Sequence, residues 1–372
     1  MDEQRVDYQN RAPGGIMNAG YLGAFSMAVY CLSTALSAVW VMFAFSRISG
    51  ATLTFITFLM AWATFYIVHL LRGHDPLRLL REKWRAVVLI NVLTLFSWWF
   101  MFMALQRIEA SVESAIYQGW MPLVVLICEA IALKAPISRF RWIGALLILA
   151  SLLGLVIVRV LLGATAMVSV ERLYEGIALA TVAGITGGVY VYCSGRLNLG
   201  KQYSAMDILC TRFFLLMLVT GWVGREGLIQ LFTLDTQMLF QLVGLAVVSV
   251  LIPVFSLQYS IQQLGGGRVS ILTPCVPVIA LAAEFMLSAW HTFWVPFLVT
   301  TVCIAVFLSN VWFTRVSRTP SVVAPLAVTL KLQAVRVPLK SALAIETRDV
   351  GYLWQQTRGN RLGATDPEDA RA

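Results

Sequence analysis

Long apolar runs with few charges constrain this sequence more than any other feature. A helix that crosses the hydrocarbon core of a bilayer needs about 20 mostly apolar residues. Of the 372 residues, 59% are hydrophobic and only 13% are charged, far from the balance of soluble proteins. Charged residues, Gly and Pro divide the chain into ten such runs: 17–43, 50–71, 86–106, 111–133, 142–162, 175–195, 205–223, 237–261, 269–290 and 293–314. We therefore predict an all-α integral membrane protein with ten transmembrane helices.

The positions of Lys and Arg predict its orientation, because cytoplasmic segments of membrane proteins retain positive charge. With the N-terminus inside, 22 of the 28 Lys and Arg residues fall on the cytoplasmic side. Both termini are then cytoplasmic: a short segment, 1–16, and a polar tail, 315–372, which we expect to be mobile. This topology explains the net charge of +9, so the charge does not call for a nucleic-acid partner.

Two stretches in distant parts of the sequence repeat each other. PLVVLICE at 122–129 and PVIALAAE at 277–284 share proline, six apolar residues and glutamate, 155 positions apart. ALQRIEA at 104–110 and SIQQLGG at 260–266 precede them in the same order. The chain thus divides into two five-helix repeats, 17–162 and 175–314. Because five is odd, the second repeat is inverted, an organisation typical of carriers with a midplane substrate site and alternating access.

The chain resembles the EamA-type members of the drug/metabolite transporter superfamily. The likeness is carried by ALQRIEASVESAIYQGWMPLVVLI, RWIGALLILASLLGLVIV, SIQQLGGGRVSILTPCVPVIALAAE and the arginine in TRFFLLM. The family has ten helices in two inverted repeats and transports small organic molecules, so the resemblance implies the same here. The family commonly ends its fourth helix with Gly-Glu, but this sequence reads Lys134-Ala135 and Ala289-Trp290. No role of that family glutamate is carried over.

Two glutamates and one arginine are candidates for binding substrate or coupling a proton. At 1.5 Å per residue, Glu129 lies ~8 Å from the cytoplasmic end of its helix and Glu284 about 9 Å from the outer end. A carboxylate in the hydrocarbon region costs about 2.5–3.5 kcal/mol and is expected to face a cavity or a partner. The pair could exchange protons or balance a cationic group of the substrate, or simply reach the interface. Arg212 could pair with Glu129 or extend to the headgroups.

Prolines and small residues suggest where helices bend and touch. Pro122 and Pro277 each remove a helical hydrogen bond, so kinks that open carbonyls to the cavity are expected. Gly184 and Gly188 have GxxxG spacing, which predicts a close helix contact, either inside the bundle or in a homodimer. Glu113, in the first turn of its helix, suits the positive end of the helix dipole. Aromatic side chains that could line an amphipathic cavity are Trp40, Trp98, Trp99, Tyr117, Tyr190 and Tyr259.

Other function classes lack sequence support. The nucleophile, zinc and nucleotide motifs GxSxG, HExxH and GxxxxGK[ST] do not occur, so we expect no enzyme activity, catalytic residue, metal site or cofactor. The leading hypothesis is a gradient-driven exporter of a small metabolite, amino acid or drug in a bacterial inner membrane, with a proton as the candidate coupling ion. The alternative is a membrane-anchored sensory or scaffold protein that acts through its C-terminal tail.

Overall fold

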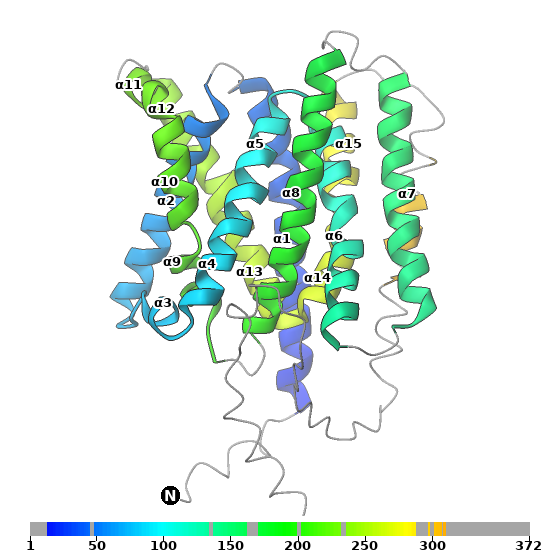
Figure 1. Cartoon of the computed structure of the whole chain (residues 1–372), viewed down its shortest axis with the longest axis horizontal. Coiled ribbons are helices and arrows are strands. Elements are labelled where there is room, and N and C mark those ends of the chain that lie inside the picture. Colours follow the sequence, from blue (N-terminus) through cyan, green and yellow to red (C-terminus); the bar gives the residue numbers. More distant parts are fainter. Residues whose placement is uncertain are drawn as a thin grey trace, which may run out of the picture. The chain divides into compact units, whose positions relative to one another are not determined.

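The described part of the chain is helical (Figure 1). In the computed structural model the described residues are 13–44, 48–133, 137–161, 170–198, 202–231, 236–287, 297, 301–306 and 308–309. The chain divides into two units, Met1–Val316 and Ser317–Ala372, and every described residue belongs to the first. The predicted tail, 315–372, therefore lies outside the described residues.

The described helices follow one another in chain order, and two of them are short π-helical segments. They are α1 (Pro13–Ala44), α2 (Gly50–Leu71), α3 (Arg78–Glu82), α4 (Trp84–Thr94), η2 (Leu95–Trp99, π-helical), α5 (Phe100–Leu105), α6 (Ala110–Leu133), α7 (Arg139–Leu161), α8 (Val170–Leu197), α9 (Ala205–Thr211), α10 (Phe214–Val223), α11 (Arg225–Leu231), α12 (Thr236–Leu245), η3 (Ala246–Leu251, π-helical), α13 (Ile252–Leu264), α14 (Gly266–Leu272) and α15 (Cys275–Leu287).

Nine described helical stretches are long and apolar enough to cross a membrane, by length and composition. They coincide with the first nine predicted spans, and the tenth, 293–314, lies mostly outside the described residues. The prediction of an all-helical, multi-pass membrane protein is confirmed to that extent. The nine stretches are Gly20–Val41, Gly50–Leu71, Trp84–Leu105, Ala110–Ala132, Arg139–Val158, Val170–Leu197, Ala205–Val223, Thr236–Leu264 and Gly266–Ala283.

Large apolar side chains cover the outside of these helices as well as their interior. Phe25, Leu218 and Phe240 are 70%, 71% and 73% exposed, and many other large apolar side chains of the spans are also exposed. Soluble monomers rarely expose contiguous apolar surface on this scale, because water makes it costly. The outer surface of the spans is therefore suited to contact lipid.

The seventh and ninth spans are broken, and the third and eighth are locally underwound into the π-helical segments η2 and η3. In the ninth span the break falls at Thr273 and Pro274, where the carbonyl of Thr273 accepts from the amide of Val276 (2.9 Å). Pro274 and Pro277 both lack the amide hydrogen that would continue the helix. The interruption thus lies upstream of Pro277, the proline expected to kink this span, whereas α6 continues through Pro122.

Helices from the two halves of the chain pack against each other crosswise. The first span (α1) lies against α13 of the eighth, and α8, the sixth, lies against α4, η2 and α5 of the third. The second span (α2) lies against α9 and α10 of the seventh (Figure 1). There the rings of Phe58 and Phe213, which are 155 positions apart, have centroids 5.1 Å apart.

Glycines of α8 make a close helix contact. A Cβ added at Gly184 would lie 2.6 Å from the carbonyl oxygen of Tyr117, and one at Gly188 would lie 2.8 Å from the Cβ of Val124. Both partners belong to α6, so the GxxxG spacing serves a contact inside the bundle. This resolves the alternative that the sequence left open for these two residues.

Candidate functional site

The break in the seventh span is held open by side chains of neighbouring helices. Asn91 on α4 donates to the carbonyl of Thr211 (2.8 Å), and its side-chain oxygen accepts from the amide of Leu215 (3.1 Å). Trp62 on α2 donates to the carbonyl of Cys210 (2.9 Å). Because backbone groups unpaired in a membrane are costly, these three bonds stabilise the interruption between α9 and α10. Arg212 lies at that interruption.

Arg212 is fully buried, with 0% of its surface exposed. Its Nη1 donates to the hydroxyl of Tyr190 on α8. The guanidinium carbon lies 4.1 Å from the centroid of the Tyr190 ring and 4.8 Å from that of Phe213, within the range of cation–π attraction. Within the described part of the chain, its Nε and Nη2 have no hydrogen-bond partner. The edge of the guanidinium formed by Nε and Nη2 thus makes no hydrogen bond to the described residues.

Tyr190 is fixed in turn by a buried glutamine. The Tyr190 hydroxyl donates to Oε1 of Gln258 on α13, and Nε2 of Gln258 donates to the hydroxyl of Ser194 (2.8 Å). Gln258 and Ser194 are both 0% exposed. The chain of bonds connects the sixth and eighth spans and sets the position of the hydroxyl that Arg212 contacts.

An internal pocket lies between the first, third, fourth and eighth spans. Glu113 lines it and is only 2% exposed; its Oε2 accepts from the hydroxyl of Ser114 (3.3 Å), and its Oε1 has no partner among the described residues. The free volume is about 10 Å³, roughly what one water molecule needs. The pocket is lined by Thr34, Ser37, Ala38, Val41, Trp98, Met101, Phe102, Leu105, Glu113, Ser114, Tyr117, Gln118 and Ser249.

Tyr117 connects the pocket with the buried arginine. Its hydroxyl forms a hydrogen bond with that of Ser97 in η2 (2.9 Å). It is also close enough to interact electrostatically with both Glu113 and Arg212. A buried carboxyl group, in the first turn of α6, and a buried guanidinium, at the break of the seventh span, therefore both lie near the Tyr117 hydroxyl.

The glutamates singled out in the sequence lie elsewhere. Glu129, near the C-terminal end of α6, is paired with Nη2 of Arg141 on α7. The ion pair considered between Glu129 and Arg212 is therefore not formed, since each side chain has another neighbour. The alternative that Arg212 extends to the headgroups is wrong, because the side chain is fully buried. Glu284 lies on α15, but its side chain is outside the described part.

The predicted cavity aromatics separate into two groups. Trp98 and Tyr117 line the pocket, and Tyr190 contacts Arg212. The others lie outside this neighbourhood: Trp40 packs against the core, Trp99 packs on Phe100 with ring centroids 5.7 Å apart, and Tyr259 stacks on Phe255 with centroids 6.0 Å apart.

The sequence interpretation missed Glu113, Asn91 and Gln258. Its position in the first turn of α6 predicts a role at the helix dipole for Glu113, whereas the structure buries the side chain against the pocket. A usable signal was present in SVESAIYQ, where polar residues recur at helical spacing along one face of α6. Asn91 and Gln258 are amides inside otherwise apolar runs, and polar groups at that depth need partners.

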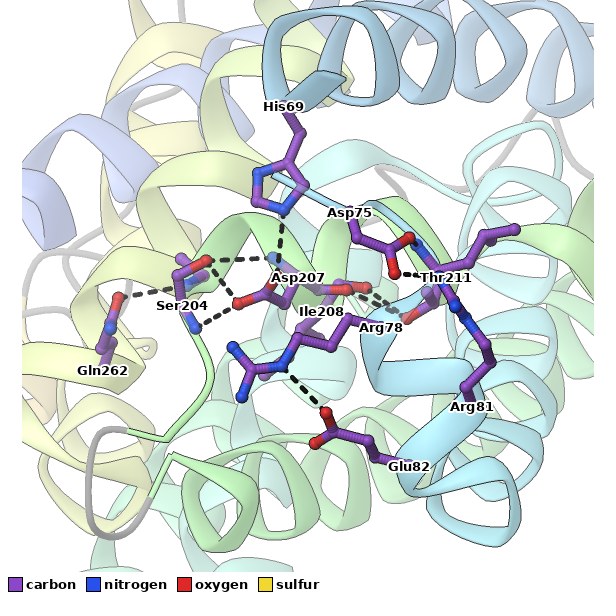
Figure 2. A network of polar contacts seen from close by, with 12 residues as sticks. His69, Asp75, Arg78, Arg81, Glu82, Ser204, Asp207, Ile208, Thr211 and Gln262 are labelled. Carbon is purple, nitrogen blue, oxygen red and sulfur yellow. Dashed lines mark hydrogen bonds and ion pairs between the residues drawn. The ribbon is translucent and has the colours of Figure 1, made fainter. Parts of the chain in front are cut away.

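A second polar network lies at the end of the bundle that the sequence predicts to be cytoplasmic (Figure 2). Nε2 of His69, at the end of α2, lies 3.0 Å from Oδ1 of Asp207 on α9. Asp207 and Ser204 form a capping box at the start of α9, and Gln262 on α13 accepts from the amide of Ala205 (3.2 Å). The network thus connects the two halves of the chain at this end.

Next to that network, Glu82 of the short α3 is held from two sides. Its Oε2 accepts from the hydroxyl of Tyr203 (2.8 Å) and its Oε1 from Nε of Arg78 (2.9 Å). These bonds, that of Tyr203 foremost, lower the pKa of the Glu82 carboxyl. Burial, together with Glu82, raises the pKa of Tyr203 to about 12, so its hydroxyl remains a donor.

Replacing Tyr203 by phenylalanine should make the free energy of unfolding less sensitive to pH in the acid range. A lowered carboxyl pKa contributes stability above the unfolded-state value and loses it as pH falls through the folded-state value. Y203F removes the main cause of the lowering, so the stability gap between wild type and Y203F should be constant near neutral pH and shrink below about pH 5. Thermal unfolding across this range measures the gap. The exposed Tyr174 provides a control as Y174F, and a gap that stays constant into acid would contradict the assignment.

Comparisons with known proteins agree with this architecture. Residues 21–157 match the EamA-like transporter family, which confirms the resemblance over the first repeat. No curated protein matches the chain. A solved structure titled "Crystal structure of protein" is similar over 81% of this chain and 99% of its own, with a TM-score of 0.57 and 18% sequence identity. That likeness concerns the fold alone.

Proposed function

We propose that this chain, an EamA-type membrane transporter by the match of its residues 21–157, is a secondary active carrier that exports a small organic molecule. The observation that carries the proposal is the buried Arg212 at a helix break, near a small pocket that is lined by Glu113 and Tyr117. Metabolites, amino acids and drugs are the candidate substrates. The organism's inner membrane and cytoplasmic termini belong to the same proposal.

Crosswise packing supports two inverted repeats. If a two-fold axis relates the repeats, a contact of the first span with the eighth requires one of the sixth with the third, and both contacts are present. Equivalent residues that touch each other lie on the pseudo-two-fold axis, and Phe58 and Phe213 satisfy this condition at the spacing of 155 read from the sequence. A site beside Phe213 is thus near the place where the two repeats meet.

Helix breaks near the membrane midplane are typical of carrier sites, because they expose backbone and charged groups to a substrate. The break at Arg212 lies about 10 Å into its span, at 1.5 Å per residue from Ala205. Side chains of α2, α4 and α8 surround it. A charge this deep in a membrane protein is expensive to maintain, which favours a functional role.

The pocket near it is too small for a substrate in the described conformation. A volume of about 10 Å³ holds no organic substrate. Substrate entry therefore requires a conformation in which the spans around the pocket separate, as alternating access provides. At the predicted cytoplasmic end, the contact between His69 and Asp207 holds α2 and α9 together and would have to open on that side.

We propose a proton as the coupling ion and Glu113 as the group that carries it. A buried carboxylate without a cationic partner is costly when ionised, so a proton is the simplest counter-charge. Glu129 is less suited to this role, because Arg141 already balances its charge. Glu284 stays a proposed coupling residue on the strength of the sequence repeat.

A reconstituted-vesicle flux assay tests the proposed function. Purified full-length protein is placed in vesicles, and efflux and uptake of a metabolite panel are followed with and without an imposed pH gradient. We expect at least one compound to move faster than in protein-free vesicles, with a rate that depends on the gradient. Flux indistinguishable from empty vesicles across the panel would contradict a carrier.

Exchange of Glu129 for glutamine tests which glutamate of α6, Glu113 or Glu129, couples transport to the proton. We expect E129Q to leave the pH dependence of transport unchanged and to alter stability by no more than about 1 kcal/mol, the scale of a partly exposed ion pair. Flux against pH and thermal unfolding measure the two effects. The parallel variant E284Q tests the second repeat. A lost pH dependence in E129Q would assign coupling to Glu129 and contradict the choice of Glu113.

A further inference from the structure

We propose that the Nε–Nη2 edge of Arg212 binds an oxyanion, so that the transported molecule carries a carboxylate or phosphate group. This inference rests on the proposed transport function and specifies the class of its substrate. At this place in the bundle, ligand oxygens would accept the hydrogen bonds that Nε and Nη2 of Arg212 do not make to the described protein.

The unused atoms of Arg212 form a binding edge. Nη1 is occupied by the hydroxyl of Tyr190, while Nε and Nη2 are free of partners among the described residues. In a guanidinium group, Nε–H and one Nη2–H point in parallel from the same side. This fork matches the two oxygens of a carboxylate or phosphate, which accept two parallel hydrogen bonds.

The charge of Arg212 also lacks an anionic partner. Arg212 takes part in none of the ion pairs seen between described side chains, which include His69–Asp207, Arg78–Glu82, Arg81–Asp75, Arg107–Glu175 and Arg141–Glu129. A buried cation without a counter-charge is strongly unfavourable. An anionic ligand removes this cost and satisfies both free nitrogens at once.

The surroundings hold the guanidinium in place for such a ligand. The rings of Tyr190 and Phe213 flank it, and Gln258 fixes the Tyr190 hydroxyl. Helix α10, ten residues long, begins two residues after Arg212. Its N-terminal end carries partial positive charge, which adds to the attraction for an anion.

The test measures binding without relying on transport. Thermal unfolding of the purified full-length protein in detergent is followed with acetate, benzoate and succinate, with the neutral amide of each, and with inorganic phosphate and methyl phosphate, at equal ionic strength. The variants are R212Q, which removes the charge, R212K, which keeps the charge but loses the fork, and R225Q, a control at an exposed arginine on α11.

We expect at least one of these anions to raise the unfolding temperature of wild type and R225Q by a few °C more than its neutral counterpart. The increase should vanish in R212Q and be clearly reduced in R212K. Without ligand, R212Q should unfold at the wild-type temperature or above, because it removes an uncompensated buried charge. A carboxylate-only or a phosphate-only response each supports the site and identifies the oxyanion.

Three results would overturn the inference: equal stabilisation by anions and amides, a full response retained in R212Q, or no response to any anion of the panel. The proposed function is judged separately in vesicles. An anion response that requires Arg212, without flux of any compound, keeps the site and rejects the carrier. Flux confined to neutral or cationic compounds and unchanged in R212Q keeps the carrier and rejects the site.

Discussion

In vesicles with a pH gradient of one unit, the variant E113Q should accumulate substrate about tenfold less than the wild-type protein. One proton that moves across one pH unit supplies about 1.4 kcal/mol, which is a tenfold concentration ratio for one-to-one coupling. Glutamine is similar in shape to glutamate but carries no exchangeable charge. Glu113 is buried against the pocket with Oε1 unpartnered, so the variant should still fold and bind.

The measurement is steady-state uptake at matched protein content, with and without the gradient. E129Q provides the matched control, since it makes the same exchange on the same helix at a residue paired with Arg141. E113Q should equilibrate its substrate while E129Q still accumulates it. If E113Q accumulates substrate as wild type does, Glu113 is not the coupling site.

Leucine at Gly184 should prevent folding of the helix bundle. A Cβ at this position already lies 2.6 Å from the carbonyl oxygen and 3.1 Å from the Cα of Tyr117. Backbone atoms cannot move aside as a flexible side chain can, so α6 and α8 would have to separate. Overpacking of this kind costs about 1–3 kcal/mol for small insertions and more for large ones. We expect G184A to be destabilised within that range and G184L to yield no monodisperse protein.

Gly20 on α1 provides the opposite case. Nothing lies within 4 Å of a Cβ placed there, and alanine favours a helix by about 0.5–1 kcal/mol over glycine. G20A should therefore match or exceed wild type in thermal unfolding, while G184A falls below it. A G184L protein that elutes and unfolds like wild type would contradict the close packing of α6 on α8.

Much of the fold follows from the sequence, because hydropathy and length suffice to locate membrane helices. Nine of the predicted spans have described counterparts, and the spacing of Gly184 and Gly188 correctly indicated a close contact. The positions of the helix breaks are harder to predict from the sequence. Pro277 pointed to the right span, but the interruption at Arg212 has no proline and depends on Asn91 from another helix.

The candidate site was only partly predictable for a related reason. Counting 1.5 Å per residue gives the depth of a side chain but not the direction in which it faces. Glu129 and Glu113 lie on the same helix, and only packing shows that one meets Arg141 while the other faces the pocket. The sequence marks Arg212 as a charge inside a span, whereas its contact with Tyr190 depends on the arrangement of helices far apart in sequence.

Counterflow in reconstituted vesicles tests the central claim most directly. Vesicles are preloaded with unlabelled compound, chosen as the one with the largest flux in the panel, and diluted into a trace of the same compound in labelled form. A carrier that alternates its access exchanges one molecule for another, so labelled compound should rise transiently inside above its outside concentration and then decline. Simple equilibration without this overshoot, or no uptake beyond protein-free vesicles, would contradict the alternating-access account.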